Sequence, residues 1–167
     1  KGAAYDNNLL CIGEKQVFCV ESVFATLMSK MSQSGAYVLN SRQVDALTKV
    51  AFTWDKEGKP HVHKDYVGKD AAVLGRAIGV EVPPTAQLLI GETDFDHPFV
   101  QEEQMMPFVP FVRCRNVDEA IAKAKHYEHG FRHTAIIHSE NVKNMTKMGR
   151  ELDMTLFVKN GPSMASL

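Results

Sequence analysis

Short apolar runs alternate with amphipathic stretches along the whole chain. The apolar runs of strand length cover residues 16–20, 87–90, 109–112, 134–137 and 155–158. Between them, apolar side chains recur every three or four residues, which is the period of one helix face. Strands that alternate with helices of about ten residues are typical of parallel sheets. We therefore predict an α/β fold with a mainly parallel sheet and helices on both faces.

Polar residues and glycines mark the expected ends of the helices. A first helix follows residues 16–20, with Phe24, Leu27 and Met31 on one face. Small polar side chains cap helices because they accept hydrogen bonds from free backbone N–H groups. The expected caps of four further helices are Ser41, Asp70, Asn116 and Ser139. Glu119 gives the Asn116 helix the spacing of a capping box. The expected helix stops are Gly35, Gly79 and Gly130.

Two stretches have no clean period. Residues 52–69 contain glycine, proline and mixed charges, and we predict a loop with at most an irregular strand. Residues 91–108 are the second candidate for a functional loop. We expect Gly91 to end the preceding strand, and Pro110 to interrupt the following one, because proline cannot donate to a strand ladder.

Size and charge exclude several classes of protein. The chain has 167 residues, which fits one domain, and its net charge is −1. No global field therefore attracts nucleic acid or an anionic membrane. No apolar run approaches the roughly 20 residues that span a bilayer, and the first residues have no signal-peptide pattern. Three cysteines at irregular spacing argue for a reducing compartment. We expect a soluble cytoplasmic protein with no nucleic-acid or membrane partner.

Cys11 is the candidate nucleophile. It follows a short polar and apolar lead-in, and we predict that it starts a brief helical turn. A helix N-terminus favours the reactive thiolate through its free N–H groups and its dipole. The alternative is a small, buried and inert cysteine. Cys19 and Cys114 are interpreted as packing residues.

Histidines and carboxylates offer further chemistry. The seven histidines lack partners at metal-ligand spacing, so we predict no bound metal. His133 and His138 bracket the strand at 134–137, where they either line a site or anchor a loop. Glu103 precedes a rigid proline segment and either binds a ligand hydroxyl or belongs to a charged loop. The chain has no GxGxxG and no P-loop motif.

Several segments resemble one known family in the same order along the chain. These are residues 6–15 around Cys11, 65–71, 97–99 with 105–107, 133–139 and 157–162. Together they resemble the coenzyme A-acylating aldehyde dehydrogenases, above all the acetaldehyde and propionaldehyde dehydrogenases of ethanolamine and propanediol utilisation. Those enzymes often have a proline before the nucleophile, where this chain has Leu10.

The resemblance implies a domain and a mechanism. Residues 1–167 would be the catalytic domain, with the nucleotide-binding domain and a C-terminal segment outside this chain. Cys11 would attack the aldehyde, pass hydride to NAD and transfer the acyl group to coenzyme A. Its backbone N–H would contribute to the oxyanion site. Glu103 would bind the nicotinamide ribose, although Met105 and Met106 depart from the wider pattern, and His133 would lie at the coenzyme A or acyl site.

The same resemblance implies partners and leaves alternatives open. It implies a short aldehyde substrate, a homo-oligomer, and work in the cytoplasm inside a bacterial microcompartment. A first alternative is the aldehyde dehydrogenase part of a bifunctional aldehyde/alcohol dehydrogenase. A second is a catalytically silent module, because nothing in this chain alone would position the nicotinamide.

Overall fold

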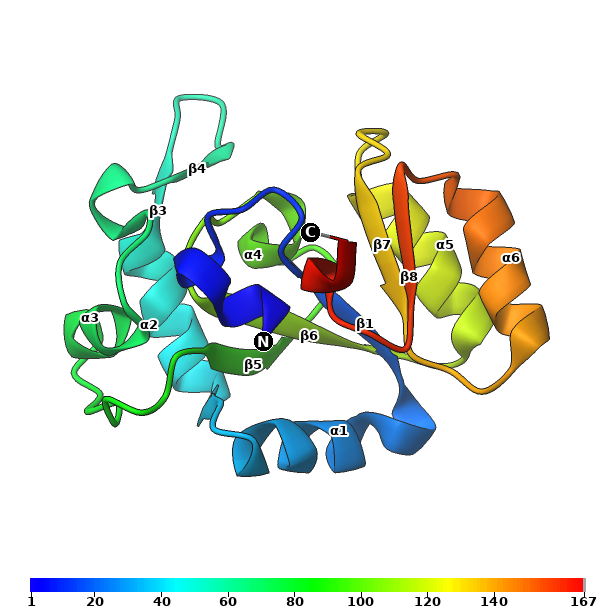
Figure 1. The fold of residues 1–167 in the computed structure, drawn as a ribbon. Coiled ribbons are helices and arrows are strands. Elements are labelled where there is room, and N and C mark those ends of the chain that lie inside the picture. The colour runs from blue at the N-terminus through cyan, green and yellow to red at the C-terminus, as the bar shows by residue number, and fades with distance from the viewer. Residues whose placement is uncertain (167) are drawn as a thin grey trace.

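A parallel sheet forms the centre of the computed structural model, which describes residues 1–166 (Figure 1). Its four strands lie in the order β1-β6-β5-β2, and each neighbouring pair is parallel. The strands are β1 (Val17–Val20), β2 (Tyr37–Leu39), β5 (Leu89–Thr93) and β6 (Phe108–Cys114). The predicted α/β class is therefore confirmed.

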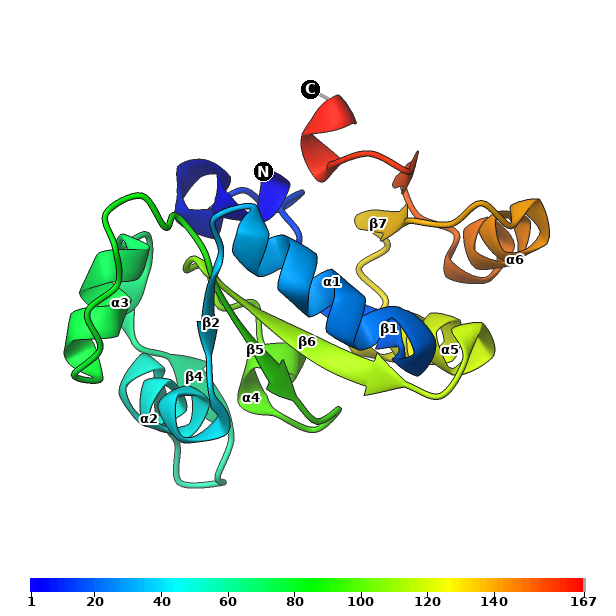
Figure 2. The same ribbon diagram turned by 90° about the horizontal axis from the view of Figure 1, so that it is seen from below.

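Helices cover both faces of this sheet (Figure 2). Those that pack on it are α1 (Glu21–Gln33), α2 (Ser41–Ala51), α3 (Ala71–Ala77), α4 (Pro98–Gln101) and α5 (Val117–Tyr127). Successive residues of a strand point to opposite faces. Accordingly, Ile90 packs in one core cluster with Phe24 of α1. Its neighbour Leu89 packs in another with Leu47 of α2 and Leu74 of α3.

A smaller unit lies at one end of the sheet. Strands β7 (Thr134–Ile137) and β8 (Leu156–Lys159) form a parallel pair of their own. They pack with α5 and with α6 (Val142–Leu152) around a separate core (Figure 1). Since α5 also contacts β1 and β6, this helix joins the two units.

The expected loop at 52–69 is instead a hairpin with a short helical turn. Strands β3 (Phe52–Trp54) and β4 (Pro60–Val62) pair antiparallel, and the 3-10 helix η2 (Lys64–Tyr66) follows. The carboxylate of Asp55 accepts hydrogen bonds from the N–H groups of Glu57 and Lys59 and closes the turn. These strands are only three residues long, too short to show a clear sequence period.

Two expected strand breaks do not occur. β5 continues through Gly91 to Thr93, and β6 runs through Pro110, which lies opposite Gly91 in the ladder. Pro110 lacks an amide hydrogen, so β6 gives up one donor there. Gly91 is needed for close packing, because a Cβ atom at this position would lie 2.5 Å from Cγ2 of Val44 on α2.

Two expected serine caps are replaced by asparagines. Asn40 Oδ1 accepts from the N–H of Gln43, and the Gln43 side chain accepts from the N–H of Asn40. Asn141 caps α6, and Ser139 instead accepts from the N–H of Asn141. In both cases the true cap lies one or two residues from the predicted serine.

Asn116 and Asp70 both lie at the expected N-cap positions, but only Asn116 caps its helix with its side chain. Asn116 accepts from the N–H of Glu119, but the Glu119 carboxylate accepts from the N–H of Arg115 and so does not complete a capping box. Asp70 precedes α3 without capping it, because its carboxylate accepts from the Asn7 amide. The predicted helix stops are confirmed, and each adopts positive φ: Gly35, Gly79 and Gly130.

Two further 3-10 helices lie near the ends of the chain, η1 (Gly2–Asn8) and η3 (Ser163–Ser166). Within residues 1–166, no helix is both long and apolar enough to cross a membrane.

The contact between Gly91 and Val44 predicts a stability effect. Gly91→Ala should lower the free energy of unfolding by about 1–3 kcal/mol, because its methyl group would displace α2. Urea denaturation followed by circular dichroism measures this. Gly161→Ala is the control, since its new Cβ would meet nothing closer than 3.4 Å. In a double-mutant cycle, Val44→Ala should offset part of the Gly91→Ala cost. Wild-type stability of Gly91→Ala would contradict this packing.

The capping of α2 can be tested with adjacent residues. Asn40→Ala removes the side-chain oxygen that accepts from the N–H of Gln43 and should cost about 1 kcal/mol of unfolding free energy. Ser41→Ala should leave it nearly unchanged, because Ser41 is already the first helical residue. If Ser41→Ala lowered the free energy of unfolding as much as Asn40→Ala in the same experiment, Asn40 would not be the residue that caps α2.

Candidate active site

Cys11 lies in a closed loop between η1 and β1. Two hydrogen bonds join the ends of residues 8–15, here called the Cys11 loop. The Asn8 side chain donates to the carbonyl of Glu14 (3.1 Å), and the Lys15 ammonium donates to the carbonyl of Asn8 (2.5 Å). At the tip, the N–H of Gly13 donates to the carbonyl of Leu10 (3.0 Å). The Cys11 thiol is exposed on this turn.

The predicted helix start at Cys11 is wrong. In the described part of the chain, η1 ends before Cys11 and the next element is β1. Asp6, Asn7 and Asn8 adopt left-handed φ values of 49°, 50° and 64°, and so reverse the chain ahead of the cysteine. Asparagine and aspartate tolerate this conformation better than most residues. A helix dipole therefore does not act on the thiol, and the positive charge near it belongs to Lys15.

Glu103 lies beside the Cys11 loop, paired with Lys15. The ammonium and carboxylate are 3.4 Å apart, with the Lys15 side chain 17% exposed and that of Glu103 51%. Burial lowers the pKa of Lys15, while the charges of Glu103 and of a Cys11 thiolate oppose that shift. Lys15, to which the sequence assigned no role, thus joins the Cys11 loop to the second predicted site residue, Glu103.

A buried glutamine fixes this arrangement to the sheet. Gln104 is fully buried, and its side-chain amide donates to the carbonyls of Lys15 (2.8 Å) and Phe108 (2.7 Å). Phe108 begins the central strand β6. Neither Gln104 nor Asn8, also fully buried, stood out in the sequence, because a polar residue in a loop gives no sign of burial.

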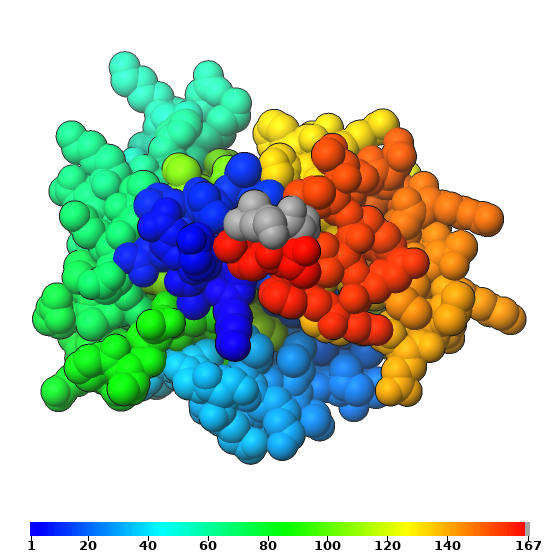
Figure 3. All heavy atoms as spheres, viewed as in Figure 1, coloured from blue at the N-terminus to red at the C-terminus, as the bar shows by residue number. Residues whose placement is uncertain are grey.

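Other segments that resemble the acylating enzymes converge on the same loop. The Asn7 amide donates to the carbonyl of Gly68 (3.0 Å), and the N–H of Gly68 donates to the carbonyl of Met105 (2.9 Å). The N–H of Ser163 donates to the Glu14 carboxylate (2.9 Å). N-terminal and C-terminal residues accordingly lie side by side on one face (Figure 3).

His133 is exposed on the loop before β7. Its ring shares a hydrogen bond with the Thr134 hydroxyl (2.7 Å). The preceding loop is held by His129, whose ring contacts the carbonyl of Gln101 (3.0 Å), and by Gln16, which donates to the carbonyl of Tyr127 (3.3 Å). Among the described contacts, none joins His133 to Cys11 or Glu103.

The remaining cysteines are buried. Burial raises the pKa of Cys19, and it raises that of Cys114 to about 11. Both therefore stay protonated near neutral pH, and their predicted packing role agrees with their positions in β1 and β6. Cys11 is the one exposed thiol of the three.

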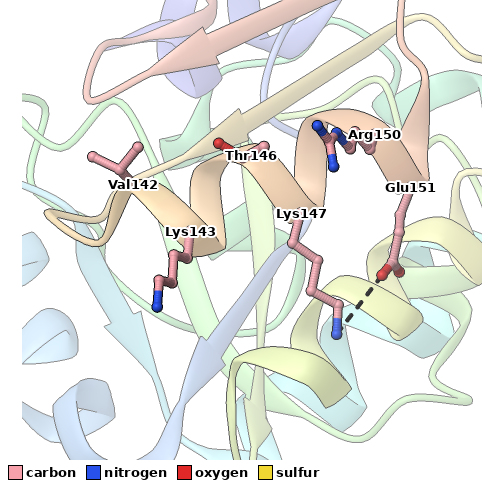
Figure 4. A pocket seen from close by; sticks show the side chains of 6 residues that line it. All are labelled: Val142, Lys143, Thr146, Lys147, Arg150 and Glu151. Atoms are coloured by element: carbon pink, nitrogen blue, oxygen red, sulfur yellow. Dashed lines mark ion pairs between the residues drawn. The ribbon is translucent and has the colours of Figure 1, made fainter.

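Two surface hollows lie away from Cys11. One runs along α6, where Lys143, Lys147 and Arg150 line a shallow groove and Lys147 pairs with Glu151 (Figure 4). The other lies beside His97, whose ring caps α4 and whose pKa is lowered by burial. Across residues 1–166, no three side chains of His, Cys, Asp or Glu lie close enough together to hold a metal ion.

The geometry of the Cys11 loop suits covalent chemistry at an exposed thiol. A thiolate there can attack an electrophilic carbon, and the half-exposed carboxylate of Glu103 can accept hydrogen bonds from sugar hydroxyls. The ribose of a dinucleotide is one group that carries such hydroxyls. The chain offers no glycine-rich cradle for its phosphates.

Curated relatives match the chain over its whole length. The acetylating acetaldehyde dehydrogenase EutE of Salmonella typhimurium is 45% identical over 100% of this chain. The CoA-propanoylating propanal dehydrogenase of Citrobacter freundii is 42% identical over 99%. The chain spans only 36% and 35% of the lengths of these proteins. No family model matches it.

Solved structures agree in fold. A Rhodopseudomonas palustris propionaldehyde dehydrogenase with bound CoA and an acylated cysteine is 40% identical, with a TM-score of 0.91 over 99% of this chain and 37% of that one. The enzyme of a Clostridium phytofermentans fucose-utilisation microcompartment is 39% identical, with a TM-score of 0.90 over 98% and 37%. An engineered glycolyl-CoA reductase with bound NADP⁺ gives the same identity and TM-score over 98% and 36%.

The two curated relatives are named for acetylation and for CoA propanoylation, and one of the solved structures holds CoA and an acylated cysteine. Over the part of their length that it spans, the chain is therefore similar in sequence and fold to the CoA-acylating aldehyde dehydrogenases.

Proposed function

We propose that this chain is the catalytic domain of an NAD-dependent, CoA-acylating aldehyde dehydrogenase that converts a short aldehyde to its acyl-CoA. Cys11 is the nucleophile. The observation that carries the proposal is its exposure on a closed loop, beside a lysine and a carboxylate, while Cys19 and Cys114 are buried. A relative of the same fold holds an acylated cysteine and bound CoA.

The reaction uses two sulfur nucleophiles in turn, the thiolate of Cys11 and the thiolate of coenzyme A. The Cys11 thiolate attacks the aldehyde carbonyl carbon, and its S–C bond gives a thiohemiacetal with the oxygen negatively charged. The backbone N–H of Cys11 stabilises that oxygen. Loss of hydride from the same carbon restores the carbonyl as a thioester on Cys11. The thiolate of coenzyme A then attacks this thioester and forms acyl-CoA, and the Cys11 thiolate leaves.

The nicotinamide cofactor supplies the hydride acceptor when bound. Glu103 is proposed to hold its ribose by accepting hydrogen bonds from the hydroxyl groups. NAD is the proposed cofactor, and NADP⁺ in the engineered glycolyl-CoA reductase supports a nicotinamide dinucleotide of either type. A nucleotide-binding domain beyond these residues would have to hold the phosphates, because the chain has no motif for them.

His133 is proposed to lie at the coenzyme A or acyl site. Its loop is tied through His129 to Gln101, two residues before Glu103, and through Tyr127 to Gln16, next to Lys15. On this loop, the exposed imidazole of His133 is proposed to contact a ligand that enters over Cys11. The neighbouring Phe131 is 81% exposed and offers an apolar surface on the same loop.

Acetaldehyde and propionaldehyde are the proposed substrates, in line with the names of the two relatives. A homo-oligomer, and work in the cytoplasm inside a bacterial microcompartment, are part of the same proposal. A Clostridium phytofermentans enzyme from such a compartment supports the latter. The bifunctional alternative rests on lower similarity, 28% identity over 87% of the chain for a Clostridium acetobutylicum aldehyde-alcohol dehydrogenase.

The role of Cys11 predicts a large loss of turnover. In the full-length protein, Cys11→Ala should lower CoA-dependent aldehyde oxidation by about a thousandfold or more, because no other exposed thiol of this chain can carry the acyl group. NADH absorbance measures the rate. Cys19→Ala, which changes a buried thiol in β1, should keep turnover at the cost of some stability. Near-normal turnover of Cys11→Ala would refute the assignment.

In the purified chain alone, we expect Cys11 to be reactive although hydride transfer does not occur. The purified 167-residue chain should produce no NADH from acetaldehyde, NAD⁺ and coenzyme A, since nothing in it cradles the cofactor phosphates. Its Cys11 should nevertheless be alkylated faster than Cys19 and Cys114, as peptide mass spectrometry can show. Measurable NADH would contradict the division into domains, and equally slow alkylation at all three cysteines would favour the silent-module alternative.

A further inference from the structure

Lys15 pairs with one of the two negative groups that the proposed chemistry requires, Glu103, and closes the loop that carries the other, Cys11. Glu103 must remain a carboxylate to accept ribose hydroxyls, and Cys11 must become a thiolate to attack. Two negative groups that share a site disfavour each other's ionisation. Lys15 contacts Glu103 at 3.4 Å, and its ammonium also feels the charge of a Cys11 thiolate.

Hydrogen bonds hold Lys15 both at its ammonium group and at its backbone carbonyl. At its tip, it donates to the carbonyl of Asn8, a fully buried residue. At its base, the Lys15 carbonyl accepts from Gln104, which is anchored to β6 through Phe108. A lysine fixed in this way loses little further freedom when it acts as a counter-charge. Most lysines on protein surfaces lack such anchors.

We propose that Lys15 is the positioning residue of this site, which closes the Cys11 loop and supplies the counter-charge that lets the Cys11 thiolate form beside Glu103. The inference rests on the proposed roles of Cys11 and Glu103. It replaces the helix dipole that the sequence suggested, because no helix begins at Cys11.

The charged groups around Lys15 set the direction of the effect. Burial of the ammonium lowers the pKa of Lys15, and Glu103, the Cys11 thiolate and Glu14 each favour its charged form. The Glu14 carboxylate also accepts from the N–H of Ser163. Removal of Lys15 leaves the Glu103 and Glu14 carboxylates uncompensated, so the thiolate should form only at higher pH. Removal of the Glu103 charge leaves Lys15 free to act on the thiol, so the thiolate should form at lower pH.

The test is the pH profile of Cys11 alkylation by iodoacetamide, followed by mass spectrometry of the Cys11 peptide. Lys15→Met should move the midpoint upward by about one pH unit, and so slow alkylation at pH 7 about tenfold. Lys15→Arg should stay near wild type. Glu103→Gln should move the midpoint downward, and the double variant Lys15→Met/Glu103→Gln should return toward wild type.

A matched control exists on the β3–β4 hairpin. Lys59 and Glu57 form a pair at the same 3.4 Å, but both side chains are largely exposed. Lys59→Met should leave the profile unchanged. The plateau rate at high pH should differ by at most about threefold between variants, because the nucleophilicity of a thiolate changes only weakly with its pKa.

Two results would overturn the inference. One is a Lys15→Met profile that coincides with wild type. The other is an equal loss of rate at every pH, with an unmoved midpoint, which would mean that Lys15 only shapes the loop. Neither depends on turnover. If Cys11→Ala keeps turnover in the full-length protein, the proposed function fails. If turnover is lost but the Lys15→Met midpoint stays in place, only the role of Lys15 fails.

Discussion

The side-chain amide of Gln104 connects the candidate site to the fold. It donates to the carbonyl of Lys15 in the Cys11 loop and to the carbonyl of Phe108 at the start of β6. Two hydrogen bonds from one fully buried group cannot be replaced by water without opening the core. The loop, which has little regular structure, therefore takes its position from the central strand. Glu103 precedes Gln104 directly and is placed by the same contact.

The sequence could predict those elements of the fold whose apolar residues recur at a regular spacing. Three of the four strands of the central sheet, the apolar faces of α1 and α2, and the glycines after three helices follow from local spacing. The fourth strand, β2, has only three residues and was not predicted. The errors occurred where a distant residue decides the conformation. Gly91 continues a strand because α2 packs against it through Val44. Asp70 does not cap its helix because Asn7, far away in sequence, takes its carboxylate.

The surroundings of Cys11 show the same limit. Its identity as the candidate came from one segment and from ordered similarity elsewhere in the chain. Its electrostatic partner could not be predicted from a helix rule, since left-handed residues before it reverse the chain. Lys15 becomes significant only when residues 103–104 fold against it. A counter-charge from a side chain responds to mutation and to neighbouring carboxylates, whereas a helix dipole changes little with either.

The burial of Cys19 and Cys114 has a consequence for redox chemistry. A thiolate exposed enough to attack an aldehyde is also exposed to peroxide, which converts it to a sulfenic acid. Neither buried thiol of this chain can reach Cys11 to form a protecting disulfide without unpacking β1 or β6. Within this chain, reversal therefore depends on a small thiol from solution, and without one oxidation proceeds to the irreversible acids. Because the core holds the other two cysteines away from solvent, no second thiol of this chain can form a disulfide with an oxidised Cys11.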